Sequence, residues 1–223
     1  MDLIFMGPPG AGKGTQAEIF RERHGLPHIS TGDILRQAVR DDTDVGRRAS
    51  AYMHEGDLVP DQIVDEVVQI RLAEPDSAGG FILDGYPRTL AQADALDAWL
   101  AREGRSLDAV VWFEIREEVL LRRLTGRRVC PVCGAVYHLD YKPPRIAQRC
   151  DLDGADLIQR QDDARNTVLR RLQVFYRWTA PLVEHYRRRG LFLTVNAERP
   201  VMDVYHEIRE FVQSRAGEGS RPG

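Results

Sequence analysis

The residues with the clearest chemical potential lie between Gly7 and Thr15, in the sequence Gly-Pro-Pro-Gly-Ala-Gly-Lys-Gly-Thr. This segment matches the phosphate-binding pattern G-x-x-x-x-G-K-[ST], except that Gly14 precedes the expected hydroxyl residue, Thr15. Backbone N–H groups of such a glycine-rich loop, and the helix N-terminus that follows it, attract phosphate. Lys13 can reach the β- and γ-phosphates, and Thr15 can support Mg²⁺, so the segment predicts nucleotide binding.

Asp84 follows an apolar run and precedes the sequence Gly85-Tyr86-Pro87-Arg88. A carboxylate at the end of a strand, beside a phosphate loop, suits a Mg²⁺ ion that it holds directly or through water. The alternative is an ordinary turn-forming Asp before Gly. The neighbouring phosphate loop favours the metal interpretation.

Arginines recur wherever the chain is expected to face the cleft. A guanidinium group offers planar, bidentate contact to phosphate oxygens, although a solvated helix surface is the alternative for any single Arg. We favour a functional role for Arg88 and Arg160, and we interpret Arg170 and 187–189 as ordinary surface. The full set is Arg36, Arg88, Arg123, Arg127, Arg160 and Arg171. We find no Ser–His–Asp constellation, and the residue types favour transfer between two phosphates over hydrolysis.

All three cysteines lie in one short segment with the spacing Cys130-x₂-Cys133-x₁₆-Cys150-x₂-Asp153. This is a four-ligand zinc spacing with Asp in the fourth place, and four protein ligands leave no site for a catalytic water. We therefore expect a structural zinc. Another carboxylate, Asp151 or Asp156, could be the fourth ligand, and iron or another divalent metal could replace zinc. Three free thiols beside a chance Asp are the alternative, which the two paired spacings disfavour.

An α/β fold must position these residues. Apolar runs predict buried strands at Leu3–Met6, His28–Ser30, Phe81–Leu83, Ala109–Phe113 and Leu191–Val195. Helical patterns lie between them, at Gln16–Arg23, Asp61–Leu72, Leu90–Glu103, Glu117–Thr125, Asp162–Arg189 and Val201–Ser214. Alternating strands and helices predict a parallel sheet covered on both faces, with its ligands beyond the carboxyl ends of the strands. That rule places the phosphate loop beside Asp84.

The 223 residues suffice for one large α/β core with small inserts. We expect a core of residues 1–29, 60–126 and 164–214, interrupted by a helical insert at 30–59 and by the cysteine-bearing segment at 127–163. The latter has too few apolar residues to fold alone, and a bound metal would supply the missing stability. Residues 215–223 are expected to form a disordered tail.

Charge and hydropathy argue against several classes of function. The 31 basic and 34 acidic residues give a net charge of −3, which disfavours a nucleic-acid-binding role. No apolar run approaches the ~20 residues of a membrane span, and the N-terminus lacks the pattern of a secretion signal. We therefore expect a cytoplasmic protein with neither a membrane nor a nucleic acid as its partner.

Taken together, the motifs resemble the bacterial adenylate kinases of the long-lid, zinc-containing type, over residues 1 to about 214. They are Gly7–Thr15, Ser30-Thr-Gly-Asp-Ile-Leu-Arg36, Asp84-Gly-Tyr-Pro-Arg-Thr89, Gly126-Arg-Arg128 and Arg160-Gln-Asp-Asp163. The resemblance implies a monomer that reversibly converts ATP and AMP into two ADP with Mg²⁺. It also implies an AMP-binding insert at 30–59 and a mobile lid at 127–163.

The resemblance assigns individual roles. Phosphoryl transfer would use Lys13, Arg88, Arg123, Arg160 and Arg171. ATP would be held by Gly10, Ala11, Gly12, Lys13, Gly14, Thr15, Arg123, Arg127, Val136, Tyr137 and Arg199. AMP would be held by Thr31, Arg36, Asp57, Leu58, Val59, Gly85, Tyr86, Pro87, Arg88, Gln92, Arg160 and Arg171, with the Gln92 amide pairing with the adenine edge. Asp84 would hold Mg²⁺ through water, and Cys130, Cys133, Cys150 and Asp153 would hold zinc.

Two positions depart from the family pattern: Tyr86 stands where Phe is usual, and Asp153 replaces a cysteine found in many relatives. Related kinases remain rivals. A GTP:AMP phosphotransferase would share the long lid, whereas a UMP/CMP kinase would have a short one. A P-loop regulatory switch would need only one nucleotide site, which the second arginine-rich site disfavours. A zinc-ribbon nucleic-acid module would explain 127–163 but not the phosphate loop.

Overall fold

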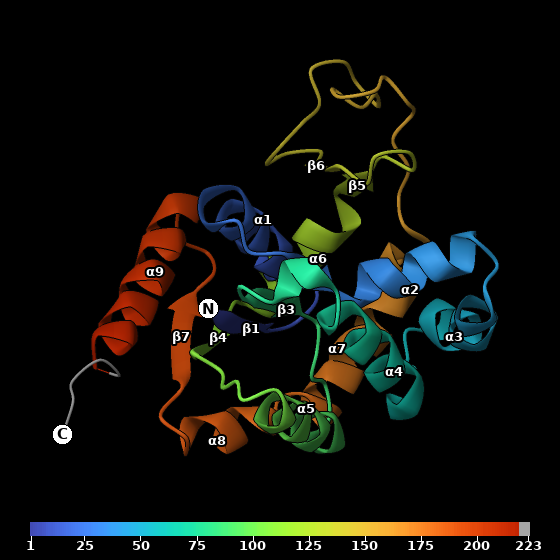
Figure 1. Ribbon diagram of the computed structural model, residues 1–223. Helices are drawn as coiled ribbons and strands as arrows, with labels where there is room; N and C mark the ends of the chain where they lie inside the picture. Colours follow the sequence, from blue (N-terminus) through green and yellow to red (C-terminus); the bar gives the residue numbers. More distant parts are fainter. Residues whose placement is uncertain (219–223) are drawn as a thin grey trace.

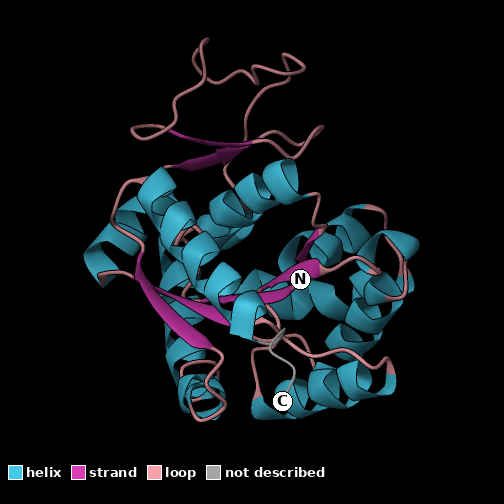
Figure 2. Cartoon of the chain, turned by 60° about the vertical axis from the view of Figure 1, so that its left-hand side comes forward, coloured by secondary structure: helices cyan, strands magenta, loops and turns pink. Residues whose placement is uncertain are grey.

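The computed structural model describes residues 1–218 and is built around a five-stranded sheet with the strand order β2-β3-β1-β4-β7. Every pair of neighbouring strands in this sheet is parallel. The strands are β1 (Asp2–Met6), β2 (His28–Ser30), β3 (Phe81–Asp84), β4 (Ala109–Glu114) and β7 (Phe192–Asn196). Helices cover both faces (Figures 1 and 2), so the predicted α/β class with a five-stranded parallel sheet is confirmed.

Both faces of the sheet are buried because side chains alternate along each strand. On β1, Ile4 and Met6 belong to one core cluster, whereas Leu3 and Phe5 belong to the other. The first cluster packs against α2 (Thr31–Arg40), α3 (Asp44–Glu55), α4 (Asp61–Leu72), α5 (Leu90–Arg102) and α8 (Leu182–Arg187). The second packs against α1 (Lys13–His24), α6 (Glu117–Thr125), α7 (Arg165–Trp178) and α9 (Val201–Glu218). This sandwich fixes the carboxyl edge of the sheet, where the site lies.

The segment 127–163, here named the lid segment, projects away from the sheet (Figures 1 and 2). It contains the antiparallel strands β5 (Arg127–Val129) and β6 (Val136–His138), and it ends in a short 3₁₀ helix, η2 (Gln161–Asp163). Within it, Cys130, Tyr137 and Cys150 form a small core cluster that is separate from the two clusters of the sheet. So small a cluster agrees with the expectation that apolar burial alone cannot fold this segment.

The structure contradicts two predictions about how the chain is divided into elements. The helix expected at 162–189 is divided into η2, α7 and α8, with the main break at 179–181. Pro181 has no N–H to donate and disfavours helical backbone in the residue before it, which accounts for this break. The disordered tail was expected from residue 215, but α9 continues to Glu218. Residues 219–223 of that expected tail lie outside the described residues.

Within residues 1–218, no helix is both long enough and apolar enough to cross a lipid bilayer.

Candidate active site and metal-ligand cluster

The loop between β1 and α1 has the backbone of a phosphate cradle. Gly10 and Gly12 have φ values of 84° and 98°, which side-chain-bearing residues rarely adopt. A Cβ atom on Gly10 would also lie 2.8 Å from the Leu124 side chain. Helix α1 begins at Lys13 with no side-chain cap and no acidic residue in its first turn. Its first N–H groups and its positive end are therefore available to an anion.

Lys13 lies folded over this loop. Its Nζ atom donates to the carbonyl oxygens of Gly7 at 2.9 Å and Pro8 at 3.0 Å. Burial lowers the pKa of Lys13 to about 8; the Asp84 carboxylate opposes this shift, while the positive charge of Arg88 adds to it. The lysine is thus a cation held in a desolvated and already positive site, where phosphate oxygens would stabilise its charge.

Asp84 lies beside the loop because of the strand register, which pairs Phe5 of β1 with Asp84 at the end of β3. Its Oδ1 atom lies 4.0 Å from Lys13 Nζ, and its Oδ2 atom lies 3.3 Å from Nε2 of His28. Burial raises the pKa of this carboxyl, but the hydrogen bond from His28 and the charge of Lys13 outweigh burial and lower it overall. Asp84 therefore remains an anionic oxygen donor next to Gly14, and such a group fits a hard divalent cation.

Arginines from distant parts of the chain converge on the same cleft. Burial, followed by the charge of Arg171, lowers the pKa of Arg88 to about 10. Burial, followed by the charge of Arg36, lowers the pKa of Arg160 to about 10. Burial also lowers the pKa of Arg171, and Arg127 and Arg36 contribute to that shift. These mutual effects show that the cations are close enough to destabilise one another's charge, which an incoming polyphosphate would relieve.

Carboxylates balance part of this positive charge. Asp33 accepts from Arg36 at 2.7 Å and from Arg160 at 3.2 Å. Asp162 lies 3.1 Å from Arg171 and 3.5 Å from Arg36. Burial raises the pKa of Asp33, but its arginine partners lower it well below its usual range. The two carboxylates join the lid segment, α2 and α7 through their arginines.

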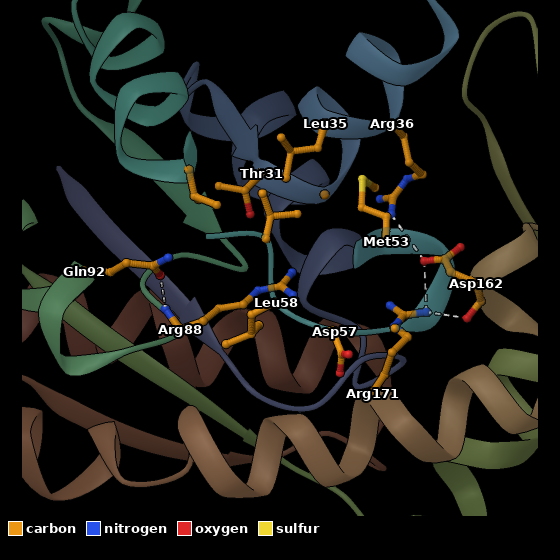
Figure 3. Close-up of a pocket in the computed structure, with 14 residues that line it drawn as sticks. Thr31, Leu35, Arg36, Met53, Asp57, Leu58, Arg88, Gln92, Asp162 and Arg171 are labelled. Carbon is orange, nitrogen blue, oxygen red and sulfur yellow. Dashed lines mark hydrogen bonds and ion pairs between the residues drawn. The ribbon is translucent and has the colours of Figure 1, made fainter. Parts of the chain in front are cut away.

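A pocket opens between this charge cluster and the helices α2–α5 (Figure 3). Its wall is apolar at Leu35, Met53, Leu58, Val59 and Val64. Figure 3 shows Arg36, Asp162 and Arg171 grouped at one side of the pocket and Gln92 with Arg88 at the other. An apolar wall between a guanidinium cluster and an amide suits a ligand that carries a flat base and a phosphate.

Most of the expected AMP-side residues line this pocket, whereas Gly85, Tyr86, Pro87 and Arg160 are not among its lining residues. Thr31 donates to the carbonyl oxygen of Gly85 at 3.0 Å, and Arg88 Nε donates to the same oxygen at 2.7 Å. Gln92 and Tyr86 are both 2% exposed. The hydroxyl group of Tyr86 donates to Asp65 at 2.7 Å, and its oxygen lies 3.2 Å from the Gln92 carbonyl oxygen. Asp57 lines the pocket and is paired at 2.7 Å with Arg170, an exposed residue that agrees with the surface position expected for it.

The residues expected on the ATP side lie in different surroundings, and only some of them border the phosphate loop. Arg123 borders the phosphate loop, since its guanidinium donates to the carbonyl oxygens of Ala11 at 3.4 Å and Ala197 at 3.0 Å. Arg127 is bound to Asp163. Val136 is exposed on β6. The Tyr137 hydroxyl faces the cysteine cluster, and Arg199 is paired with Glu207 at 2.6 Å. The ATP contacts of all these residues stay predictions.

The three cysteines and Asp153 form one cluster, with ligand atoms that all lie within 4.8 Å of one another. Cys133 Sγ lies 3.5 Å from Cys150 Sγ, and Cys130 Sγ lies 3.2 Å from Asp153 Oδ2. Backbone N–H groups of Val132 and Leu152 point at Cys130 and Cys150 Sγ, each at 3.4 Å, as donors to thiolates would. Three sulfurs and one carboxylate oxygen with such support fit a tetrahedral metal ion.

The two alternative carboxylates are engaged elsewhere. Asp151 accepts from the backbone N–H of Arg145 at 2.8 Å, and Asp156 faces solvent near Arg149. Asp153 is therefore the carboxylate that belongs to the cluster.

Sequence reasoning did not single out Asp33, Asp61 or Asp162 for a role. Asp33 stands three residues before Arg36 on a helix, a spacing that brings the two side chains together and could have indicated the pair. Asp61 opens α4 and accepts from Thr89 and Gln92. No local signal predicts that contact, because the partners are 28 and 31 residues away.

The structure combines a parallel sheet that carries a phosphate loop with a second pocket that shares the cations of that loop. These features define a P-loop phosphotransferase of the nucleoside monophosphate kinase class. A family model described as adenylate kinase matches residues 5–191. The chain belongs to the adenylate kinase family.

Curated relatives extend the match over nearly the whole chain. An adenylate kinase of Moorella thermoacetica is 51% identical over 204 residues, covering 92% of this chain and 94% of the relative. One of Exiguobacterium sibiricum is 47% identical over 209 residues, covering 94% and 97%. One of Archaeoglobus fulgidus is 48% identical over 213 residues, covering 96% and 98%.

Proposed function

We infer that this protein is an adenylate kinase that catalyses the reversible reaction ATP + AMP = 2 ADP. The observation that carries this conclusion is the shared charge cluster: Arg88 and Arg171 line the second pocket and also act electrostatically on Lys13 of the phosphate loop. A chain that bound only one nucleotide would not need a second, amide-bearing pocket against the same cations.

On the acceptor side, AMP would place its base against Leu35, Met53 and Val59, near the Gln92 amide. The adenine-facing role of Gln92 is consistent with its burial at one side of the pocket. The phosphate of AMP would then lie among Arg36, Arg88 and Arg171. Thr31, Asp57, Leu58, Gly85, Tyr86 and Pro87 complete the proposed AMP site as wall and backbone residues.

On the donor side, residues 10–15 would surround the ATP phosphates with backbone N–H groups, and Lys13 would neutralise them. Arg123 supports this role because it borders the loop. Phosphoryl transfer would run between the two sites, with Arg88, Arg160 and Arg171 stabilising the charge that develops on the transferred group. Exclusion of water by the lid segment would favour AMP over hydrolysis.

The proposed metals have separate tasks. Mg²⁺, when bound with ATP, would neutralise phosphate charge, and Asp84 is the residue that would hold it through water. Zinc would bind Cys130, Cys133, Cys150 and Asp153 and hold the lid segment together. Because all four ligands come from the protein, this metal would be structural.

The insert at 30–59 and the lid segment would move as nucleotides bind, so that Arg36, Arg127 and Arg160 release their carboxylate partners to reach phosphates. We also propose that the protein acts as a monomer in the cytoplasm. A tight coupling of two nucleotides in one chain requires no second subunit.

The test is a matrix of donors and acceptors with purified protein. ATP with AMP is expected to give the highest kcat/KM, and a bisubstrate analogue in which two adenosines are joined by a phosphate chain is expected to inhibit competitively against both. A strong preference for GTP over ATP would indicate a GTP:AMP phosphotransferase. Slow hydrolysis without any acceptor would indicate a regulatory switch.

A further inference from the structure

We propose that Asp61 is a specificity-determining residue for the acceptor base, because it fixes the orientation of the Gln92 side-chain amide. The proposal rests on the proposed function, in which Gln92 faces the base of AMP. It concerns a residue outside the pocket wall that acts on the base only through Gln92.

The Gln92 amide is held at both ends. Its Nε2 atom donates to Asp61 Oδ1 at 2.8 Å, and its Oε1 atom accepts from the backbone N–H of Arg88 at 2.7 Å. A carboxylate only accepts and a backbone N–H only donates, so these partners distinguish the two ends of the amide. A reversed amide would set oxygen against oxygen at Asp61 and NH₂ against N–H at Arg88. The burial of Gln92 makes both mismatches costly because water cannot replace the lost partners.

Asp61 is itself held in place. The hydroxyl group of Thr89 donates to Asp61 Oδ2 at 2.8 Å and accepts from the backbone N–H of Gln92 at 3.2 Å. Thr89 therefore donates its single hydroxyl proton to Oδ2 of Asp61. The other carboxylate oxygen, Oδ1, remains as the acceptor for Gln92. The first turn of α4 and the first turn of α5 thus form a closed ring of hydrogen bonds whose direction cannot be reversed without breaking a contact.

A fixed amide can tell one purine from another. With one N–H used by Asp61 and one lone pair used by Arg88, Gln92 still has an N–H and a lone pair to offer. Adenine presents an acceptor at N1 and a donor at its 6-amino group, which this pair complements. A 6-oxopurine presents a donor at N1 and an acceptor at O6, the reverse pattern, and would need the reversed amide. Asp61 therefore favours adenine over 6-oxopurines at the acceptor site.

The test compares AMP with inosine 5′-monophosphate, whose hypoxanthine base differs at positions 6 and 1 without adding a 2-amino group. The variant is Asp61→Asn, which keeps the size of the side chain. Since Thr89 continues to donate to the amide oxygen, Asn at this position turns its NH₂ toward Gln92 and favours the reversed amide. The ratio of kcat/KM for AMP to that for inosine monophosphate is expected to fall by about tenfold or more.

The control is Asp65→Asn, which removes a carboxylate one turn further along α4. Asp65 accepts from Tyr86 rather than from the Gln92 side chain, so the ratio is expected to stay within about twofold of that of the native enzyme. A merely structural role for Asp61 would lower both kcat/KM values together and leave their ratio unchanged in Asp61→Asn; that result, in folded protein, would overturn the proposal. Asp61→Ala, which removes only one of the two orienting partners, is expected to give a smaller fall in the same direction.

Calorimetric affinities for AMP and inosine monophosphate, measured on the same variants, provide a readout that does not depend on turnover. A native protein that binds AMP without phosphorylating it would contradict the proposed function, while its AMP-to-inosine-monophosphate affinity ratio would still decide the role of Asp61. An unchanged affinity ratio in Asp61→Asn would reject the orientation of Gln92 by Asp61 whatever the catalytic result.

Discussion

Arg127 and Asp163, separated by 36 residues along the chain, form a buried ion pair in which Arg127 Nε donates to Asp163 Oδ2 at 2.8 Å. Arg127 is the first residue of the lid segment and Asp163 is its last. The pair therefore joins the two ends of the segment where they connect to the rest of the molecule. The Asp163 side chain is fully buried and also lies 3.3 Å from Arg171. The base of the lid segment is thus bound by charge rather than by apolar packing.

Replacing Asp163 by Ala is expected to destabilise the protein by roughly 3–5 kcal/mol, because Arg127 would remain buried without its partner. The measurement is the free energy of unfolding in urea. Asp156→Ala is the control: it removes an exposed carboxylate 3.9 Å from Arg149 and is expected to change stability by less than about 1 kcal/mol. A loss below that same limit for Asp163→Ala would show that the buried pair does not stabilise the fold.

Arg88→Ala is expected to lower kcat by roughly 10³-fold or more at saturating AMP while the fold stays intact. The reason is that an arginine that stabilises the transferring phosphoryl group contributes about 10³- to 10⁵-fold. Arg187→Ala removes an exposed guanidinium that packs over Phe192 and serves as the control, with nearly native turnover expected. Near-native turnover of Arg88→Ala would remove Arg88 from the catalytic residues.

The dependence of kcat/KM for ATP on pH is expected to report the titration of Lys13. Its pKa of about 8 in the free protein lies below the ordinary value, because burial disfavours the charged form. The cation is present below that pKa and lost above it, so kcat/KM for ATP is expected to fall as the pH rises through about 8. Bound phosphates would stabilise the Lys13 cation and raise its pKa in the complex. We therefore expect kcat to stay constant up to a higher pH than kcat/KM does. A flat kcat/KM between pH 7 and about 10 would contradict this assignment.

Metal removal is expected to weaken the lid segment before it affects catalysis. Protein prepared without chelator should contain about one zinc per chain, and chelation should lower Tm while activity at moderate temperature is largely kept. Asp153→Ala is expected to reduce zinc retention, whereas Asp156→Ala should leave it unchanged because that side chain faces solvent. Native protein free of any bound metal, or equal retention in both variants, would contradict the assigned ligand set.

Tyr86→Phe deletes one buried hydroxyl group. Burial raises the pKa of Asp65, and the hydrogen bond from Tyr86 opposes that shift, so the hydroxyl helps to keep Asp65 charged. Its removal is expected to cost about 1–2 kcal/mol of unfolding free energy. Tyr52→Phe, at a side chain that is 41% exposed, is the control and should be nearly neutral. A neutral Tyr86→Phe would mean that the hydrogen bond to Asp65 does not stabilise the fold.

The sequence predicts best where a residue's role follows from its neighbours along the chain. The bounds of the helices Asp61–Leu72 and Glu117–Thr125 agree with the structure, because apolar periodicity marks them directly. The expected closeness of Asp84 to the phosphate loop also holds, since parallel strands end at a common edge. The break at 179–181 was missed because a long periodic pattern outweighed a single proline.

Pairings across the chain are harder to foresee. Nothing local to Asp61 indicates Gln92, and nothing local to Arg170 indicates Asp57, because these contacts depend on how helices pack after folding. The contact between the Tyr137 hydroxyl and Cys150 is a further pairing that no local pattern indicates.

Because Asp33 and Asp162 already pair with the arginines of the cleft, binding of phosphate there would be an exchange of one anion for another. The guanidinium groups of the cleft already pair with carboxylates of the same chain, so a phosphate that binds there would replace a carboxylate instead of meeting unpaired positive charge. The affinity for phosphate would then depend on how much more strongly the arginines bind phosphate than carboxylate. When the product departs, the same carboxylates are expected to pair again with Arg36, Arg160 and Arg171 and so to speed its release. We therefore expect rapid turnover in both directions.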